Sequence, residues 1–162
     1  MARDIEYDDQ RLRQLFAELN SKRQKQVFRQ AFRRGANTLR REAVKNLRSS
    51  IRSDRDLEKG IRSIVFRQAV GFRVTVGTGR GNVGFHKTRR GVLKPVLMWA
   101  EDGTEYRRTR GSAKRPSRVT GKMKKYGFLE RAKNQTVGRI TNDIREAVAN
   151  GIIKTSQKYG CQ

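Results

Sequence analysis

The chain has few of the residues from which enzyme sites are usually built. Its 162 residues include one cysteine, Cys161, and one histidine, His86. A single cysteine cannot form an intrachain disulfide, so the sequence does not indicate an oxidising compartment. One histidine and one cysteine also cannot supply the usual zinc sites or nucleophilic triads. We therefore expect neither kind of site.

Long apolar runs are missing as well. No run approaches the roughly 20 apolar residues that a membrane-spanning helix needs. The first nine residues, MARDIEYDD, lack the apolar core of a signal peptide. We therefore expect a protein that is made in the cytoplasm and has no membrane partner.

Acidic residues are scarce, and basic residues are abundant. The chain has 39 Lys and Arg against 15 Asp and Glu, a formal net charge of +24. Residues 59–100 carry nine Lys or Arg and no acid, and residues 106–129 carry another nine and no acid. This excess predicts a polyanion or an acidic protein surface as the partner. With 35% hydrophobic residues, we expect one domain with a thin core that belongs to an assembly.

Two patterns have to be tested for chemistry. Residues 79–84 read G-x-G-x-x-G, but the residues that follow cannot start an apolar-periodic helix, so we reject a dinucleotide site. Glu101, Asp102 and Glu105 could hold Mg²⁺ in a nuclease. The simpler interpretation is a turn, Glu-Asp-Gly-Thr, whose charges offset nearby arginines. We therefore expect no catalytic residue, no metal, no cofactor and no enzymatic activity.

Helical periodicity dominates the first third of the chain. Residues 1–20 form an acidic N-terminal arm with four acids among the first nine residues, followed by a short helix around Leu12–Leu19. Ser21 and Gln24 fit a capping box, and one apolar stripe then predicts a long helix over about 22–48. Gly35 weakens this helix, so we expect it to allow close packing against another element.

After the predicted long helix, the spacing of apolar residues changes from helical to alternating. Ile64–Phe66 and Phe72–Val76 predict two strands around a turn near Gly71. The apolar run Val92–Ala100 predicts a strand or a short helix, and 106–110 predicts a basic strand. Residues 111–125 have almost nothing to bury and predict a mobile basic loop.

Helical spacing returns from Phe128 to near Gly160. We expect an α+β fold in which the long N-terminal helix and the C-terminal helix pack on one face of a small antiparallel sheet. Residues 21–160 would form this single domain, with a mobile basic loop at 107–125.

Two motifs in the second half of the chain resemble a known family. Met98–Thr104 (MWAEDGT) is followed by a polar loop, then by Tyr126–Ala132 (YGFLERA) and an amphipathic helix. This order resembles the tail-component family of long-tailed double-stranded DNA phages, whose members are typically tail-completion or head-tail joining proteins. Upstream, Leu47–Ile51 or Leu57–Ile64, and Val74–Gly77, look like further elements of that family. The resemblance covers roughly residues 10–158.

Three positions depart from the family pattern. Asp102 stands where the family has an aromatic residue, and Gly127 and Arg131 stand where it has two prolines. The segment 107–125 is also unusually basic. These departures affect subunit contacts and register more than the family resemblance itself.

The resemblance implies a structural virion protein at the neck or top of the tail, assembled in the host cytoplasm. It implies a subunit of a hexameric ring that docks the tail to the head connector while genomic DNA passes through the centre. Its partners would be copies of itself, head-connector proteins and tail-tube or terminator proteins. The subunit interface would then include Trp99, Glu101, Asp102, Gly103 and Thr104.

The basic loop has two possible targets in such a ring. A lumen lined with many cations would hold DNA that must leave quickly, so we expect the loop to meet acidic surfaces of neighbouring rings. A solvated loop kept basic for solubility is the alternative. The residues concerned are Arg107, Arg108, Arg110, Lys114, Arg115, Arg118, Lys122, Lys124 and Lys125.

The rival function is a non-enzymatic basic nucleic-acid-binding protein of the ribosomal or nucleoid type, for which a charge of +24 is ordinary. No helix-turn-helix, zinc-finger or aromatic RNP pattern is present in the sequence. Such a protein would show steep salt dependence on free DNA or RNA.

Overall fold

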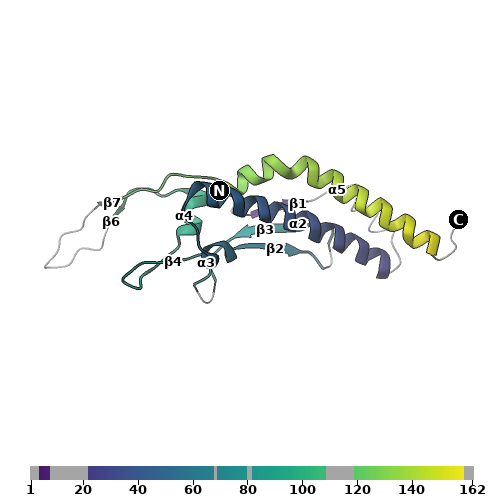
Figure 1. Cartoon of the computed structure of the whole chain (residues 1–162), viewed down its shortest axis with the longest axis horizontal. Coiled ribbons are helices and arrows are strands. Elements are labelled where there is room, and N and C mark those ends of the chain that lie inside the picture. The colour runs from purple at the N-terminus through teal and green to yellow at the C-terminus, as the bar shows by residue number, and fades with distance from the viewer. Residues whose placement is uncertain (1–3, 8–21, 68, 80–81, 109–118, 159–162) are drawn as a thin grey trace.

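The computed structural model describes residues 4–7, 22–67, 69–79, 82–108 and 119–158. It has an α+β architecture, as the sequence predicts, in an elongated molecule with both long helices along its axis (Figure 1). The elements in chain order are β1 (Asp4–Tyr7), α2 (Lys22–Ser50), α3 (Arg55–Lys59), β2 (Ile61–Val65), β3 (Phe72–Val76), β4 (His86–Lys87), β5 (Leu93–Lys94), α4 (Val96–Asp102), β6 (Arg107–Arg108), β7 (Val119–Gly121) and α5 (Phe128–Lys158).

The main sheet has three antiparallel strands in the order β1-β3-β2. The predicted hairpin is confirmed, with Val65 opposite Phe72 and Ile61 opposite Val76, but its first strand covers 61–65 and not the predicted 64–66. Along β3, Phe72, Val74 and Val76 are buried while Arg73 and Thr75 are only partly covered, the alternation expected of a sheet with one face on the core. Strand β1 adds Ile5 opposite Val74 and was not predicted from the acidic N-terminal sequence.

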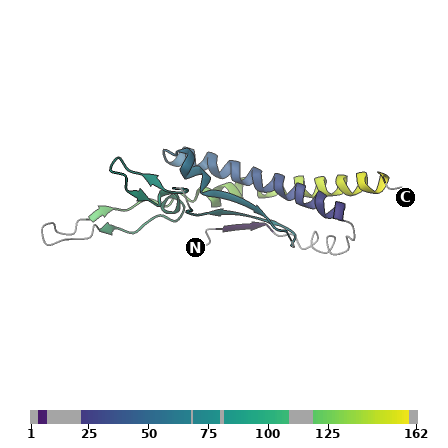
Figure 2. The ribbon, with the colours of Figure 1, turned by 90° about the horizontal axis from the view of Figure 1, so that it is seen from below.

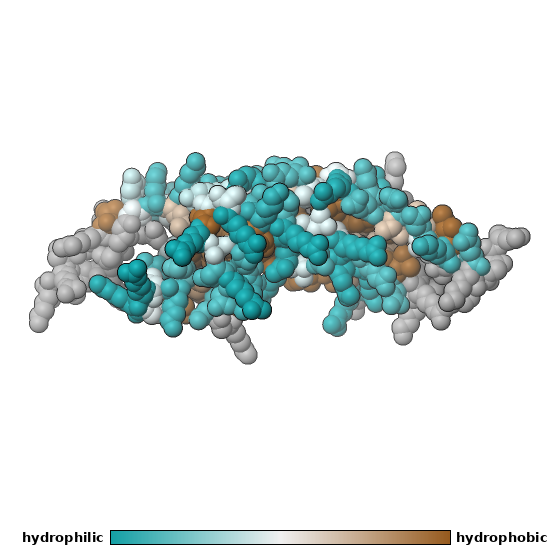
Figure 3. Space-filling model, in the orientation of Figure 1, coloured by the Kyte–Doolittle hydropathy of each residue, from teal (hydrophilic) through white to brown (hydrophobic). Residues whose placement is uncertain are grey.

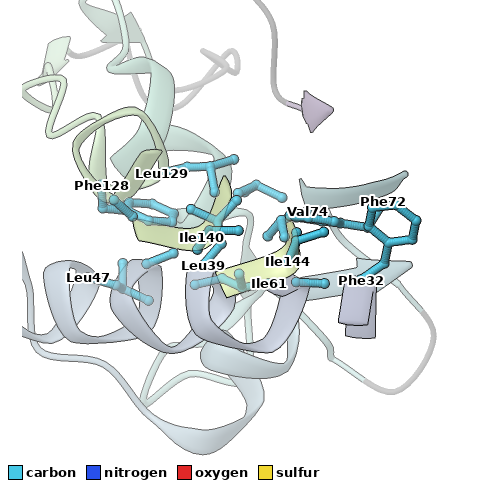
Figure 4. Close-up of a cluster of buried hydrophobic side chains, with 14 of the residues drawn as sticks. Phe32, Leu39, Leu47, Ile61, Phe72, Val74, Phe128, Leu129, Ile140 and Ile144 are labelled. Carbon is cyan, nitrogen blue, oxygen red and sulfur yellow. The ribbon is translucent and has the colours of Figure 1, made fainter. Parts of the chain in front are cut away.

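Helices α2 and α5 lie side by side and cover one face of this sheet (Figure 2). The predicted long helix is confirmed, and its apolar stripe is buried at Phe28, Ala31, Phe32, Ala36, Leu39, Ala43 and Leu47. These side chains meet residues of β2, β3 and α5 in one cluster (Figure 4). A single core therefore joins the first and last helices.

The predicted stripe of α5 needs one correction. Val137, placed in the stripe by its spacing, is 43% exposed, and its neighbour Thr136 is buried instead. The Thr136 hydroxyl donates to the Ala132 carbonyl oxygen at 2.7 Å. Because this bond satisfies the hydroxyl within the helix, threonine can occupy a core position.

Gly35 has the role expected of it. A Cβ at Gly35 would lie 2.8 Å from Ile144 Cδ1 and 2.9 Å from Ile140 Cγ2, so the missing side chain lets α5 approach α2 closely. The two helices are also joined by polar groups, since the buried Asn46 donates from Nδ2 to Gln135 Oε1 at 2.9 Å. Packing and hydrogen bonding therefore fix the same interface.

The segment between β3 and α5 agrees with the expectation in part. The run 92–100, predicted as a strand or a short helix, contains β5 and then the helix α4. The basic strand predicted at 106–110 contains β6, and the mobile loop predicted at 107–125 is corrected at its other described end, because β7 pairs antiparallel with β6, with Gly121 opposite Arg107. Strand pairing satisfies backbone groups without apolar side chains to bury, which is why composition alone predicted a loop.

Candidate interaction site: an anchored basic arm

Strands β6 and β7 form a narrow ribbon that projects from one end of the molecule (Figures 1 and 2). We call the described residues 104–108 and 119–125 the basic arm. Within the described part of the chain, β6 and β7 make their main contacts with each other and not with the helices or the central sheet. The arm is therefore free to contact another molecule.

The predicted basic residues are distributed unevenly over the described structure. Arg107 and Arg108 form β6, and Lys122, Lys124 and Lys125 follow β7 with exposed side chains. Lys122 Nζ lies 5.5 Å from the ring centroid of Tyr106, which is 66% exposed. Lys125 Nζ lies 3.3 Å from Glu130 Oε2. Four further predicted residues lie outside the described residues: Arg110, Lys114, Arg115 and Arg118.

At its base the two sides of the arm are hydrogen-bonded to each other, and the residue that follows the arm, Tyr126, is hydrogen-bonded to α4. The Thr104 N–H donates to the Met123 carbonyl oxygen at 3.0 Å, and the Met123 N–H donates to Thr104 Oγ1 at 2.8 Å. The Tyr126 N–H donates to the Ala100 carbonyl oxygen at 2.9 Å. Met123 and Tyr126 also pack against the core, so the arm leaves the body in a defined direction.

Glu101 joins α4 to the start of α5. Its side chain is buried, and Glu101 Oε2 accepts a hydrogen bond from the Leu129 N–H at 3.0 Å. Burial raises the pKa of the Glu101 carboxyl, while the N–H groups of Leu129 and Glu130 act in the opposite direction. A carboxylate at a helix N-terminus satisfies free N–H groups and interacts favourably with the helix dipole. Glu101 therefore acts as a cap supplied from another helix.

This geometry corrects the expected turn at 101–104. Glu101 and Asp102 are the last residues of α4, and the chain turns only at Gly103, whose φ is +76°. The Gly103 N–H donates to the Trp99 carbonyl oxygen at 2.8 Å. The Asp-Gly pair does mark the turn, but the partner of Glu101 lies 28 residues later in the sequence, beyond the reach of local pattern reasoning.

The five predicted interface residues lie together at this joint. Glu101 is buried within the chain, whereas Trp99, Asp102, Gly103 and Thr104 are partly buried. A Cβ at Gly103 would lie 3.0 Å from the backbone N of Lys125, so the glycine allows the base of the arm to pack tightly. In this structure they belong to the segment from which the arm leaves the body, and contact with a second subunit stays a prediction.

Two of the departures from the family pattern have a structural explanation. Gly127 has φ +54°, which proline cannot adopt because its ring fixes φ near −65°. Arg131 donates from Nη2 to the Asn46 carbonyl oxygen at 3.3 Å and also bonds Ser50 Oγ. The chain thus enters α5 by a left-handed glycine, and Arg131 ties α5 to the end of α2.

The glycine motif at 79–84 also has a structural role at its last position. Gly84 has φ +78°, and a Cβ there would lie 2.5 Å from the Gly77 carbonyl oxygen. The Gly84 N–H donates to the Asp56 carbonyl oxygen at 3.0 Å, and the next regular element is β4 rather than a helix. A glycine is needed at position 84 because the backbone there lies too close to the backbone at Gly77 for a side chain to fit.

Within the residues that the structure describes, no three His, Cys, Asp or Glu side chains gather closely enough to hold a metal ion. None of the helices in the described segments is long and apolar enough to cross a membrane.

No family model matches the sequence, and no curated protein or solved structure matches it either. The residues and their geometry are therefore the basis for assigning a function.

Proposed function

We propose that the chain is a tail-completion or head-tail joining subunit of a long-tailed double-stranded DNA phage. In this proposal it is a structural protein without enzymatic activity, and it assembles as a hexameric ring at the neck. The ring docks the tail to the head connector and surrounds the path of the DNA. The resemblance of the two motifs, 98–104 and 126–132, is the starting point.

One observation supports the proposal most directly: these two motifs contact each other. Glu101 of the first motif accepts a hydrogen bond from Leu129 of the second, and Ala100 accepts one from Tyr126. The residues that carry the resemblance thus form one joint, and this joint holds the basic arm. A firmly held arm beyond the body suits a subunit that has to reach a neighbour in a ring.

The charge of the arm favours an acidic partner. Lys122 and Lys124 are exposed, and the whole segment 106–129 contains no Asp or Glu. Complementary charge speeds docking and fixes the register of two surfaces. An acidic protein ring above or below would provide that complement without holding the DNA in the channel.

The proposed ring can be tested by measuring the size of the assembly that the protein forms. The mass of the purified protein in moderately high salt, measured by native mass spectrometry with and without DNA, distinguishes the two functions. A closed assembly near six subunits, alone or with connector or tail protein, supports the neck function. A monomer that assembles only on nucleic acid contradicts it.

The arm is tested separately by charge removal. The double variant K122Q/K124Q should form rings normally and reduce head-tail joining, and replacing every Lys and Arg of 107–125 with Gln should block joining. The matched control K133Q/R139Q removes two exposed cations from α5 and should join normally. Normal joining by the fully neutralised arm would refute the proposed role.

A basic nucleic-acid-binding protein remains the second candidate, because the net charge is +24. The face seen in Figure 3 is mostly hydrophilic, as this function also requires. Such a protein would bind free DNA or RNA with a steep salt dependence and without a closed ring.

A further inference from the structure

A second two-stranded ribbon, distinct from the basic arm, is formed by β4 and β5. We call residues 86–94 the short ribbon. Its turn is closed by three hydrogen bonds: Thr88 N–H to the Val92 carbonyl oxygen at 2.9 Å, Gly91 N–H to the Thr88 carbonyl oxygen at 2.9 Å, and Val92 N–H to Thr88 Oγ1 at 3.1 Å. Gly91 has φ +78°, as a tight turn requires. The ribbon therefore presents its tip in a defined shape.

The short ribbon carries charge of one sign. Its four cationic residues, Lys87, Arg89, Arg90 and Lys94, are all exposed. Within the described residues, no hydrogen bond or ion pair engages these four side chains. The nearby acid that the ribbon does meet is Asp54, whose Oδ2 lies 3.8 Å from His86 Nδ1 at the base. Two cations at the turn, Arg89 and Arg90, and two on the strands, Lys87 and Lys94, are thus available to an anion.

The position of the ribbon leaves it accessible. As far as the structure describes the chain, β4 and β5 make their main contacts with each other. Figures 1 and 2 both show the ribbon at the end of the molecule where the basic arm also projects. Two basic ribbons therefore extend from one end of the body.

We infer that the short ribbon binds double-stranded DNA by entering a groove. The major groove of B-DNA is about 12 Å wide and admits a two-stranded ribbon. Arg89 and Arg90 at the turn reach phosphates or base edges, because guanidinium groups bind both with paired hydrogen bonds. Val92 and Leu93, 55% and 42% exposed, supply apolar contacts to thymine methyl groups.

Two features favour DNA over an acidic protein surface. Of the residue types enriched at the buried centres of protein interfaces, residues 87–94 contain arginine but no aromatic side chain and no methionine. The cations lie along a narrow two-stranded ribbon and at its turn, a shape that fits a groove better than a flat surface. A role in solubility alone does not explain why Val92 and Leu93 are exposed beside them.

The experiment measures binding of the full chain to a fluorescein-labelled duplex of about 20 base pairs by anisotropy at several NaCl concentrations. Each phosphate contact contributes about 0.9 to the slope of log affinity against log salt. The variant R89Q/R90Q should therefore lower the slope by about 2 and weaken binding on the order of 10- to 100-fold at 0.1 M salt.

The matched control is R33Q/R34Q, which removes two adjacent exposed arginines from α2. This control changes the net charge by the same amount as R89Q/R90Q. It should leave the affinity for the duplex and the slope of log affinity against log salt nearly unchanged. The variant V92S/L93S should weaken binding without changing the slope. Far-UV circular dichroism should be the same for all three variants.

Three outcomes overturn the inference. They are wild-type affinity and slope for R89Q/R90Q, an equal loss for R33Q/R34Q, and displacement of the duplex by polyglutamate at equal charge concentration, which would indicate an acidic protein partner. The inference does not depend on the neck function. If the protein binds DNA but forms no ring, only the neck function is refuted. If it forms rings but the short ribbon does not contribute to DNA binding, only the inference is refuted.

Discussion

Two glycines in the long helices, Gly35 and Gly138, predict opposite effects of the same substitution. A Cβ at Gly35 would lie 2.8 Å and 2.9 Å from Ile144 and Ile140, whereas a Cβ at Gly138 would have no heavy atom within 4 Å. Both residues are helical. Alanine therefore gains the same helix propensity at both sites, and only Gly35 adds a steric cost.

The magnitudes follow from these surroundings. Gly to Ala inside a helix is worth about 1 kcal/mol in favour of the folded state. G138A should show most of this gain. At Gly35 the added methyl group overpacks the interface, which costs about 1–3 kcal/mol. G35A should therefore lie between roughly neutral and about 2 kcal/mol less stable than wild type, so the two variants should differ by about 1–3 kcal/mol.

Urea unfolding followed by circular dichroism at 222 nm measures this difference. The proteins are compared at one concentration and one salt, because assembly and charge both shift apparent stability. The m-value should stay constant, which shows that the compactness of the states is unchanged. Equal stabilisation by G35A and G138A would refute the close contact of α2 and α5 at Gly35.

Three further predictions concern the joint and the helix interface. E101A should lower the free energy of unfolding by about 1–3 kcal/mol, because the buried Leu129 N–H loses its acceptor. E101Q keeps an acceptor and should lower it less in the same urea assay. Burial raises the pKa of the Glu101 carboxyl above its unfolded value, so part of the stability that this group contributes below its unfolded pKa is lost as pH rises through the raised pKa. Unfolding of wild type and E101Q from about pH 4 upward should show wild type losing stability relative to E101Q, and parallel curves would contradict this. G127A should cost about 1–2 kcal/mol because φ is positive there, and G127P should cost more; a stable G127P protein in thermal unfolding would disprove that backbone conformation. N46A should cost about 1 kcal/mol through its lost bond to Gln135, and wild-type stability in urea would show that this bond is not needed.

The sequence predicted those parts of the fold that depend on local periodicity. The stripe from Phe28 to Leu47 and the alternation from Phe72 to Val76 identified α2 and β3, because burial of one face imposes a period on the residues. The periodicity wrongly predicted that Val137 is buried. Thr136 is buried instead, because its hydroxyl is hydrogen-bonded within the helix and can therefore occupy a core position.

The parts that sequence reasoning missed depend on distant partners. Strand β1 has four residues, DIEY, and becomes a strand by pairing with β3, far along the chain. Glu101 is a cap only because Leu129 is brought to it. For the candidate site, the sequence identified the basic residues and the motifs, but it could not predict that Thr104 and Met123 would pair across the base of the arm or that Tyr126 would bond Ala100.

The packing of Gly35 against Ile140 and Ile144 has a consequence for synthesis of the chain. Ile140 follows Gly35 by 105 positions, so α2 leaves the ribosome long before α5 exists to cover it. At about 5–20 residues per second, Phe28, Phe32 and Leu39 wait on the order of 5–20 s for their partners. During that time, repulsion between the many cations of the growing chain opposes aggregation of the exposed stripe. The positive charge on which the proposed anionic partner rests therefore also opposes aggregation of the chain before it is folded.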